Sequence, residues 1–177
     1  PEGLNVVHDG LDVSFRKNKK DFSPEGPWPN NYFDYDPAIG EDIDGVDLNR
    51  NFDFNWVFGD TFMEPDPSDY AAHYDYYRGT TPWSESEIRA VRDLALENDY
   101  VFSIAWHSSR SGSLSEKVYN SWRWDGDKKT PDNTTIKGIG DQIAELILKE
   151  NSSDTYQSLY GQSRNGKAHD WFYHATG

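Results

Sequence analysis

The chain has 177 residues, which is enough for one domain with its own hydrophobic core. Its formal net charge of -14 argues against nucleic acid and anionic membranes as partners, because both require a basic surface. The absence of cysteine excludes disulfides, thiolate metal sites and a cysteine nucleophile, and no apolar run approaches the roughly 20 residues that span a bilayer. Aromatic residues make up 15% of the chain, so we expect them to supply much of the core volume.

The first predicted element is a short strand at residues 12–15, where polar and apolar residues alternate. Arg16-Lys17-Asn18-Lys19-Lys20 follows, and it is the only dense basic run in this acidic chain. Taken alone, such a run is more often a solvated cationic loop. The alternative is a clamp for an anion or for a polarised carbonyl group.

Residues 21–44 are predicted to form a loop, because prolines interrupt both helix and central strand: Pro24, Pro27, Pro29 and Pro37. Carboxylates follow one another at short spacing and could hold calcium: Asp34, Asp36, Glu41, Asp42, Asp44 and Asp47. Their spacing matches no calcium-binding loop that we can defend. A solvated acidic loop is therefore the preferred interpretation, and a calcium site is the alternative.

Residues 45–53, Gly-Val-Asp-Leu-Asn-Arg-Asn-Phe-Asp, are predicted to be the end of a short strand that runs into a polar loop. Arg50 stands between two asparagines. Its guanidinium is a fixed fork of donors that suits a carboxylate, and the amide of Asn49 adds a further donor. The alternative is an ion pair from Arg50 to Asp47 or Asp53 that only ties down the turn.

An amphipathic helix of about three turns is predicted after Ser84, which forms a capping-box pattern with Glu87. Apolar residues recur on one face at helical spacing: Ile88, Val91, Leu94 and Ala95. The nearly continuous apolar run at residues 100–106 then predicts a central strand that is buried on both faces. His107 stands at the end of this strand, where sites of open α/β sheets gather. Taken alone, such a histidine is more often a hydrogen-bonded structural residue than a metal ligand.

Residues 110–135 are predicted to form a polar loop in which Trp122 and Trp124 pack. A second amphipathic helix is predicted at residues 136–150, with apolar side chains on one face: Ile139, Ile143, Leu146 and Ile147. The last part of the chain carries two tyrosines, Tyr156 and Tyr160, and then a Gly-Lys-Ala-His-Asp-Trp sequence at residues 166–171.

Five segments, in the same order, resemble the zinc carboxypeptidase family: Phe15-Arg16-Lys17-Asn18, Asp47-Leu48-Asn49-Arg50-Asn51-Phe52, residues 77–87, Ile104-Ala105-Trp106-His107-Ser108, and residues 156–173. The resemblance covers nearly the whole chain. It implies an α/β fold, a three-layer αβα arrangement with a mixed, largely parallel central sheet. It also implies that residues 1–177 are a single domain, the central part of a carboxypeptidase catalytic domain that lacks its N-terminal and C-terminal portions.

The resemblance implies a zinc metallocarboxypeptidase that hydrolyses the C-terminal peptide bond of peptides or proteins. By that resemblance, His107 is one ligand of a single Zn²⁺ ion. Arg16 polarises the scissile carbonyl and stabilises the oxyanion, while Asn49 and Arg50 hold the terminal carboxylate of the substrate. Tyr160 would cap the same carboxylate.

Two assignments near the C-terminus leave alternatives. Tyr156 is the reserve for Tyr160, because the gap from Tyr160 to Gly166 is longer than the family pattern. The resemblance also implies that Lys167, Ala168 and His169 line the pocket for the terminal side chain of the substrate. A cationic pocket would favour an acidic terminal residue, and the alternative is a lysine that points into solvent.

The sequence departs from the family in two features. It lacks the His-x-x-Glu segment, which in the family supplies two zinc ligands. It also lacks the catalytic glutamate, which in the family follows the Asp-Trp motif. We therefore expect these 177 residues to be inactive by themselves. The alternative function is a non-catalytic module that binds peptide C-termini. Most relatives act outside the cytoplasm, which predicts a secreted or extracytoplasmic protein, and the oligomeric state is left open.

Overall fold

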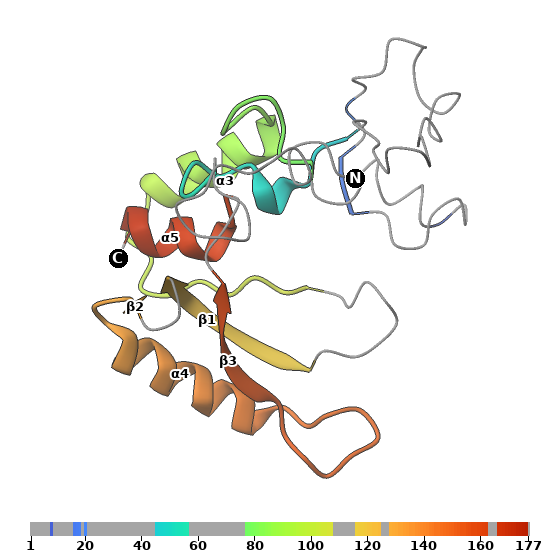
Figure 1. Ribbon diagram of the computed structural model, residues 1–177, viewed down its shortest axis with the longest axis vertical. Helices are drawn as coiled ribbons and strands as arrows, with labels where there is room; N and C mark the ends of the chain where they lie inside the picture. Colours follow the sequence, from blue (N-terminus) through green and yellow to red (C-terminus); the bar gives the residue numbers. More distant parts are fainter. Residues whose placement is uncertain are drawn as a thin grey trace.

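The computed structural model describes residues 8, 16–18, 20, 45–56, 77–107, 116–124, 128–162 and 166–176. Along the chain the described elements are a 3-10 helix and six helices and strands: η1 (Leu48–Arg50), α3 (Ser86–Leu96), β1 (Lys117–Trp124), β2 (Lys128–Lys129), α4 (Asn133–Leu146), β3 (Gln157–Gln162) and α5 (Ala168–Thr176) (Figure 1). The strand predicted at residues 12–15 and the acidic loop predicted at residues 21–44 lie outside the described residues. Of the carboxylates in the calcium alternative, only Asp47 is described.

The described strands form one mixed sheet in the order β2-β1-β3. β1 pairs with β2 in the antiparallel direction and with β3 in the parallel direction, in a register that sets Lys117 opposite Gln157 and Asn120 opposite Tyr160. Parallel neighbours require a long crossover connection, and α4 supplies it between β2 and β3. The sheet is therefore mixed, as the resemblance implies.

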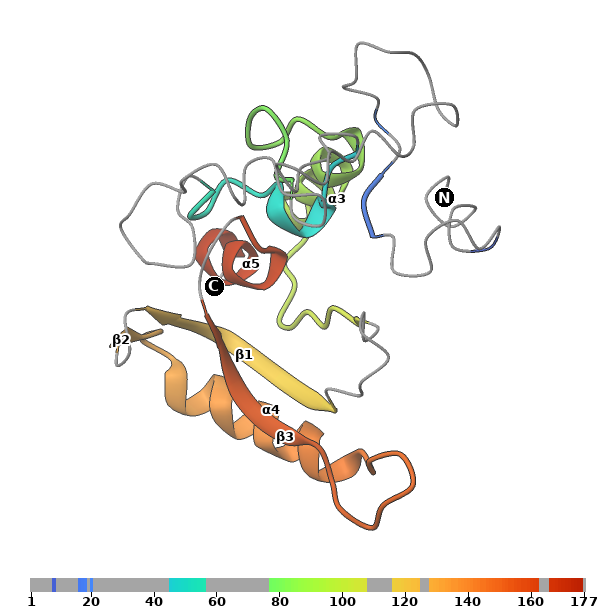
Figure 2. The same cartoon turned by 45° about the vertical axis from the view of Figure 1, so that its right-hand side comes forward.

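The sheet lies between two helices, α4 on one face and α5 on the other (Figures 1 and 2). Successive side chains of a strand point to opposite faces, and β1 shows this directly. Asn120 of β1 lies against Gly140 of α4, whereas the next residue, Ser121, donates a hydrogen bond from its hydroxyl to the backbone carbonyl of His169 in α5 (2.8 Å). The three-layer αβα arrangement is thus confirmed.

Aromatic rings form the main described core, which joins the loop after η1 to α3 and α5. The ring of Phe52 lies 5.3 Å from Trp83 and 5.4 Å from Trp171, and the two tryptophans are 5.1 Å apart. Ile88 and Ala95 of α3 are buried against this cluster. Large rings supply the core volume, as the composition predicts.

Helix α3 begins differently from the prediction, because the capping box at Ser84 does not form. The helix starts at Ser86 with Glu85 as its N-cap residue, and no side chain caps it. The Ser84 hydroxyl instead donates to Glu85 Oε1 (2.7 Å) and accepts from Asn51 (2.9 Å). The apolar face is also narrower than predicted, since Val91 and Leu94 are exposed while Ile88 and Ala95 are buried.

The predicted loop at residues 110–135 was wrong, because it contains β1 and β2. The valine and three aromatic residues within Lys-Val-Tyr-Asn-Ser-Trp-Arg-Trp at residues 117–124 are the signal that could have predicted β1. The second helix, predicted at residues 136–150, is α4 at Asn133–Leu146, so it starts and ends earlier along the chain.

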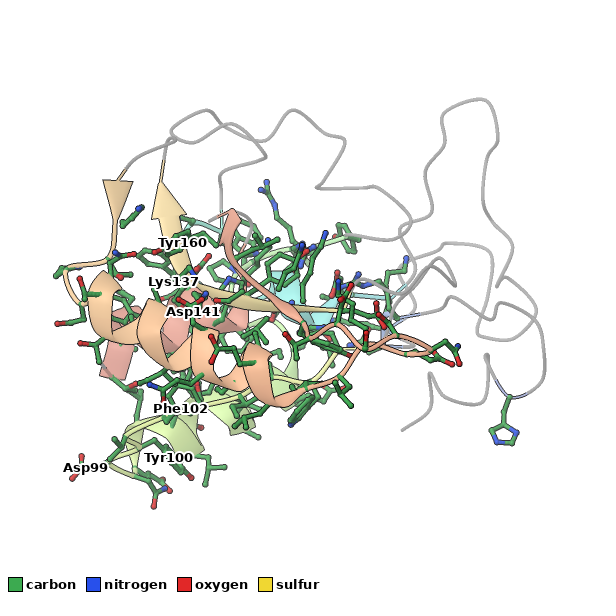
Figure 3. All side chains as sticks on the ribbon, turned by 90° about the horizontal axis from the view of Figure 1, so that it is seen from below. Asp99, Tyr100, Phe102, Lys137, Asp141 and Tyr160 are labelled. Carbon is green, nitrogen blue, oxygen red and sulfur yellow. The ribbon has the colours of Figure 1, made fainter. Side chains whose placement is uncertain are left out.

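The central strand predicted at residues 100–106 is not formed in the described part of the chain. Its side chains are exposed, including Val101 (100%), Trp106 (79%) and Ile104 (52%). Figure 3 shows Tyr100 at the edge of the molecule. The physical reason is that a strand needs a neighbour for its backbone groups, and no described strand pairs with this segment. An apolar sequence pattern predicts burial, but it does not indicate whether a neighbouring strand is present to pair with the segment.

Candidate active site

The site is built on the turn that begins at Asp47. The carboxylate of Asp47 accepts a hydrogen bond from the backbone N–H of Asn49 (3.0 Å), which starts the 3-10 helix η1 in place of the strand end predicted here. The backbone N–H of Asp47 donates to Tyr77 (2.8 Å), so the turn is also fastened to the segment before α3. Asp47 is buried, with 2% of its surface exposed.

Arg16 and Arg50 converge on this one carboxylate, although they lie 34 positions apart in the sequence. Arg16 Nη2 lies 2.9 Å from Asp47 Oδ2, and Arg50 Nη1 lies 3.8 Å from the same oxygen. Arg50 Nη1 also donates to the backbone carbonyl of Asn49 (2.7 Å). The ion-pair alternative for Arg50 is therefore present in the structure, and the same carboxylate brings two guanidinium groups together.

The basic run containing Arg16 packs against other segments at its described residues, although Lys20 keeps 41% of its side chain exposed. Lys17 is buried with 4% exposed, and Arg16 keeps 28% of its side chain exposed. Asn18 Nδ2 donates to Glu85 Oε2 (2.6 Å), and Lys20 Nζ lies 3.0 Å from Glu85 Oε1. The run is thus docked onto the residues that precede α3.

A second loop, residues 166–168, is fastened to the same turn. The backbone N–H of Phe52 donates to Gly166 (3.1 Å), and the N–H of Ala168 donates to Asn49 Oδ1 (2.9 Å). Gly166 has a positive φ of 55°, and a Cβ atom there would overlap the carbonyl oxygens of Arg50 and Phe52. Glycine is needed for this approach. It sets Lys167 beside the Asn49–Arg50 turn.

His107 lies within the electrostatic field of this cluster. Its imidazole is exposed, yet partial desolvation lowers its pKa, and the charges of Arg16, Arg50 and Lys167 lower it further, against an opposing effect of Asp47. In the described part of the chain, the charged groups that act on the pKa of His107 are therefore three cations and one carboxylate. A lowered pKa favours the neutral imidazole, which is the form that binds metals.

His169 is a second histidine whose pKa is affected by Arg50 and Lys167. Its ring keeps 27% of its surface exposed, but Nε2 is enclosed and lies 3.2 Å from Asp170 Oδ1. Burial lowers the pKa of His169 to about 3, and the charges of Lys167, His107 and Arg50 act in the same direction. His169 is therefore neutral at physiological pH.

Tyr160 is the predicted site residue that the structure does not join to the others. It lies in β3, with Lys129 Nζ 5.0 Å from its ring centroid, and Figure 3 shows it at the sheet. Among the described residues, no hydrogen bond or ring contact links Tyr160 or Tyr156 to Asn49 or Arg50. Its role at the substrate carboxylate stays a prediction.

The described residues supply one suitable zinc ligand and not a complete site. Within them, no three side chains of histidine, aspartate or glutamate gather closely enough to hold a metal ion. His107, neutral and exposed, fits the role of a single imidazole ligand. The sequence suggested Asp47 as an ion-pair partner of Arg50, but it did not indicate that Asp47 also binds Arg16, and it assigned no role to Glu85.

Comparison with known proteins identifies the chain. A family model described as zinc carboxypeptidase matches residues 4–177. The chain belongs to the zinc carboxypeptidase family. The family is zinc-dependent, and its members are peptidases of the carboxypeptidase type.

Two solved carboxypeptidase-fold structures resemble the chain. The carboxypeptidase A from Helicoverpa armigera is 21% identical, with a TM-score of 0.63, over 100% of this chain and 38% of that one. Thrombin activatable fibrinolysis inhibitor (TAFI) is 19% identical, with a TM-score of 0.56, over 96% of this chain and 38% of that one. At these identities the likeness shows the fold. The chain spans 38% of the length of each solved chain.

Proposed function

We propose that the protein containing this chain is a zinc-dependent carboxypeptidase that removes the C-terminal residue of peptides or proteins. The observation that carries the proposal is the convergence of Arg16 and Arg50 on buried Asp47, beside His107, in a chain of the zinc carboxypeptidase family. The arginines bring concentrated positive charge to a protein whose net charge is -14. Such a site attracts the carboxylate at a peptide terminus.

In this proposal Asn49 and Arg50 anchor the substrate carboxylate, with Tyr160 as a further donor. Asn49 Oδ1 is held by the N–H of Ala168, which leaves the Nδ2 end of the amide to donate to an anion. Arg16, with part of its side chain exposed, donates to the scissile carbonyl oxygen as negative charge develops there. Zinc, when bound through His107 and ligands outside the described residues, supplies a Lewis acid.

Lys167 and His169 are proposed to contact the terminal side chain of the substrate. The loop that carries them is fastened to the Asn49–Arg50 turn, and the charge of Lys167 acts on both His107 and His169. This favours a lysine that faces the site over one that faces solvent. A C-terminal Glu or Asp would then be preferred to Lys.

The remaining expectations are also proposals. We expect the 177 residues to be inactive by themselves, because their sequence contains no His-x-x-Glu segment to supply the other zinc ligands. None of the described helices is long and apolar enough to cross a membrane. We place the protein outside the cytoplasm, as is typical of its family, and propose no role for nucleic acid.

The second candidate function is a non-catalytic module that binds peptide C-termini. It is favoured by one observation: the described residues contain the cationic cluster but no group of three metal-binding side chains. In this case Arg16, Asn49 and Arg50 would capture the carboxylate without hydrolysis. Both candidate functions use the same residues to bind the peptide carboxylate, and only the first includes hydrolysis.

The test compares the longest protein that the gene encodes with the 177-residue chain. Bound zinc is measured by elemental analysis, and hydrolysis is measured on blocked dipeptides ending in Glu, Gln, Phe or Lys. We expect zinc and hydrolysis in the long protein alone, with Glu preferred to Gln.

Arg50→Lys keeps the positive charge but loses the forked guanidinium, and it should lower kcat/KM by about two orders of magnitude. Arg92→Lys, on α3, is the matched control.

Each outcome decides a different part of the proposal. A long protein without zinc or hydrolysis that still binds peptides through a free carboxylate supports the module. Unchanged kcat/KM in Arg50→Lys contradicts the anchor. Preference for a C-terminal Lys contradicts the assignment of Lys167 while leaving the carboxypeptidase function intact.

A further inference from the structure

Glu85 is a buried carboxylate that the proposed chemistry does not use. It is 4% exposed and accepts three hydrogen bonds. Asn18 Nδ2 donates to Oε2 (2.6 Å), while Lys20 Nζ (3.0 Å) and the Ser84 hydroxyl (2.7 Å) donate to Oε1. Two of these donors come from the basic run that contains Arg16, more than 60 positions away in the sequence.

The same basic run is hydrogen-bonded to Gly45 and Val46, which precede η1. The backbone N–H of Asn18 donates to the carbonyl of Val46 (2.9 Å), and the N–H of Val46 donates to Asn18 Oδ1 (2.7 Å). The N–H of Gly45 donates to the carbonyl of Lys20 (2.6 Å). The side chain of Asn18 thus bridges Val46 and Glu85, using its oxygen for one and its nitrogen for the other.

Glu85 is itself held by the residue next to Arg50. Its backbone N–H donates to Asn51 Oδ1 (3.1 Å), and Asn51 is fully buried. Asn51 Nδ2 lies within hydrogen-bond distance of Arg78, Thr81 and Ser84. Glu85 therefore stands at a fixed position relative to the turn that carries Arg50.

We propose that Glu85 is a positioning residue: its carboxylate holds the basic run in register with the Asp47–Arg50 turn and so sets where the Arg16 guanidinium stands. Arg16 lies two residues before Asn18, and its guanidinium reaches Asp47 of that turn. The proposal rests on the proposed role of Arg16 at the scissile carbonyl. A small displacement of such a group costs much of its effect on the transition state.

The chemistry of the site requires an ionised carboxylate. Burial raises the pKa of Glu85, but hydrogen bonds from Ser84, Lys20 and Asn18 outweigh it, so the pKa is lowered overall. A glutamine would place an NH₂ group against a donor and would lose the charge that strengthens these bonds. An aspartate would keep the charge and shorten its reach by one methylene group.

The kinetic test is Glu85→Gln in the longest protein that the gene encodes, with Glu87→Gln as the matched control. Glu87 is exposed and accepts from Ser86 (3.0 Å), so it loses the same charge two positions away without touching the basic run. We expect Glu85→Gln to lower kcat by about 10- to 100-fold with KM within about twofold, because the effect is on the transition state. In an Arg16→Ala background the same change should have almost no further effect.

A second readout does not depend on activity. The amide protons of Asn18 and Val46, which bond the two segments to each other, should exchange with solvent at least about tenfold faster in Glu85→Gln, with protection in α4 unchanged. If Glu85→Gln does not fold, Glu85→Asp replaces it and should show the same effects at reduced size.

Three results would overturn the proposal. One is an unchanged kcat, and another is a loss in kcat that is equally large in the Arg16→Ala background, which indicates a general structural role. The third is unchanged exchange at Asn18 and Val46. If the wild-type protein hydrolyses no substrate, the proposed function fails, and the exchange measurement alone then decides whether Glu85 holds the basic run.

Discussion

At the scale of single residues, the environment of each titratable group determines its chemistry. Asp47 is one carboxylate shared by two guanidinium groups, and His169 is a histidine kept neutral by burial and by nearby cations. The residue types alone would suggest an ordinary ion pair and a cationic pocket. Burial lowers the pKa of His169, so its imidazole is neutral and Lys167 carries the positive charge of the loop.

The neutrality of His169 predicts a pH dependence of stability. Its pKa is about 3 in the folded chain and near 6.5 when unfolded, so between these values the unfolded chain binds the additional proton. The free energy of unfolding should therefore fall as the pH falls below 6.5. The slope from this one group can reach about 1.4 kcal/mol per pH unit.

Urea denaturation of the wild type and His169→Gln at pH 8, 6.5, 5.5 and 4.5 measures this slope. We expect a shallower slope for the variant. The range stops near pH 4.5 because Glu85, whose folded pKa is also lowered, contributes below its unfolded value. Parallel curves for the two proteins would contradict a neutral His169.

At the scale of elements, α4 docks on the sheet through a glycine. A Cβ atom at Gly140 would overlap the side-chain amide of Asn120 in β1. Asn120 is 5% exposed and donates to Ser158 (2.8 Å) and to the carbonyl of Leu159 (3.0 Å), so it cannot turn away without losing both bonds. Figure 2 shows α4 lying along β1 and β3.

Two glycines of α4 allow a matched prediction. Gly140→Ala should destabilise the chain by about 1–3 kcal/mol, because the added methyl group overpacks the contact with Asn120. At Gly138 a Cβ atom meets nothing within 4 Å, so Gly138→Ala should stabilise by up to about 1 kcal/mol through helix propensity. Urea denaturation measures both. Equal stability of the two variants would contradict the close docking of α4.

At the scale of the whole molecule, the apolar segment at residues 100–106 is exposed. Val101 and Trp106 lie almost entirely in solvent, and in the described part of the chain no strand pairs with this segment. Contiguous exposed apolar residues with unpaired backbone groups promote association. This consequence could not be predicted from the sequence pattern, which indicates a buried strand.

We therefore expect the 177-residue chain to self-associate as its concentration rises. The double change Val101→Lys with Ile104→Lys should reduce the association, because it places charge on the segment. Leu146→Lys changes an exposed apolar residue of α4 (84% exposed) and serves as the control. Sedimentation velocity measures the effect, and equal association of both variants would point to another surface.

The sequence by itself determined the family, the presence of helices at α3 and α4, and the aromatic core, because each depends on local spacing, composition or ordered motifs. It did not determine which apolar side chains of these helices are buried, since Leu94 of α3 and Leu146 of α4 are exposed. It also named Arg16, Asn49, Arg50, His107 and Lys167 as site residues, and their roles stay predictions. The tertiary structure decided how Asp47 and Glu85 organise that site, where α3 begins, and that residues 100–106 pair with none of the described strands. These features depend on groups tens of positions apart meeting in space, and local periodicity carries no information about such partners.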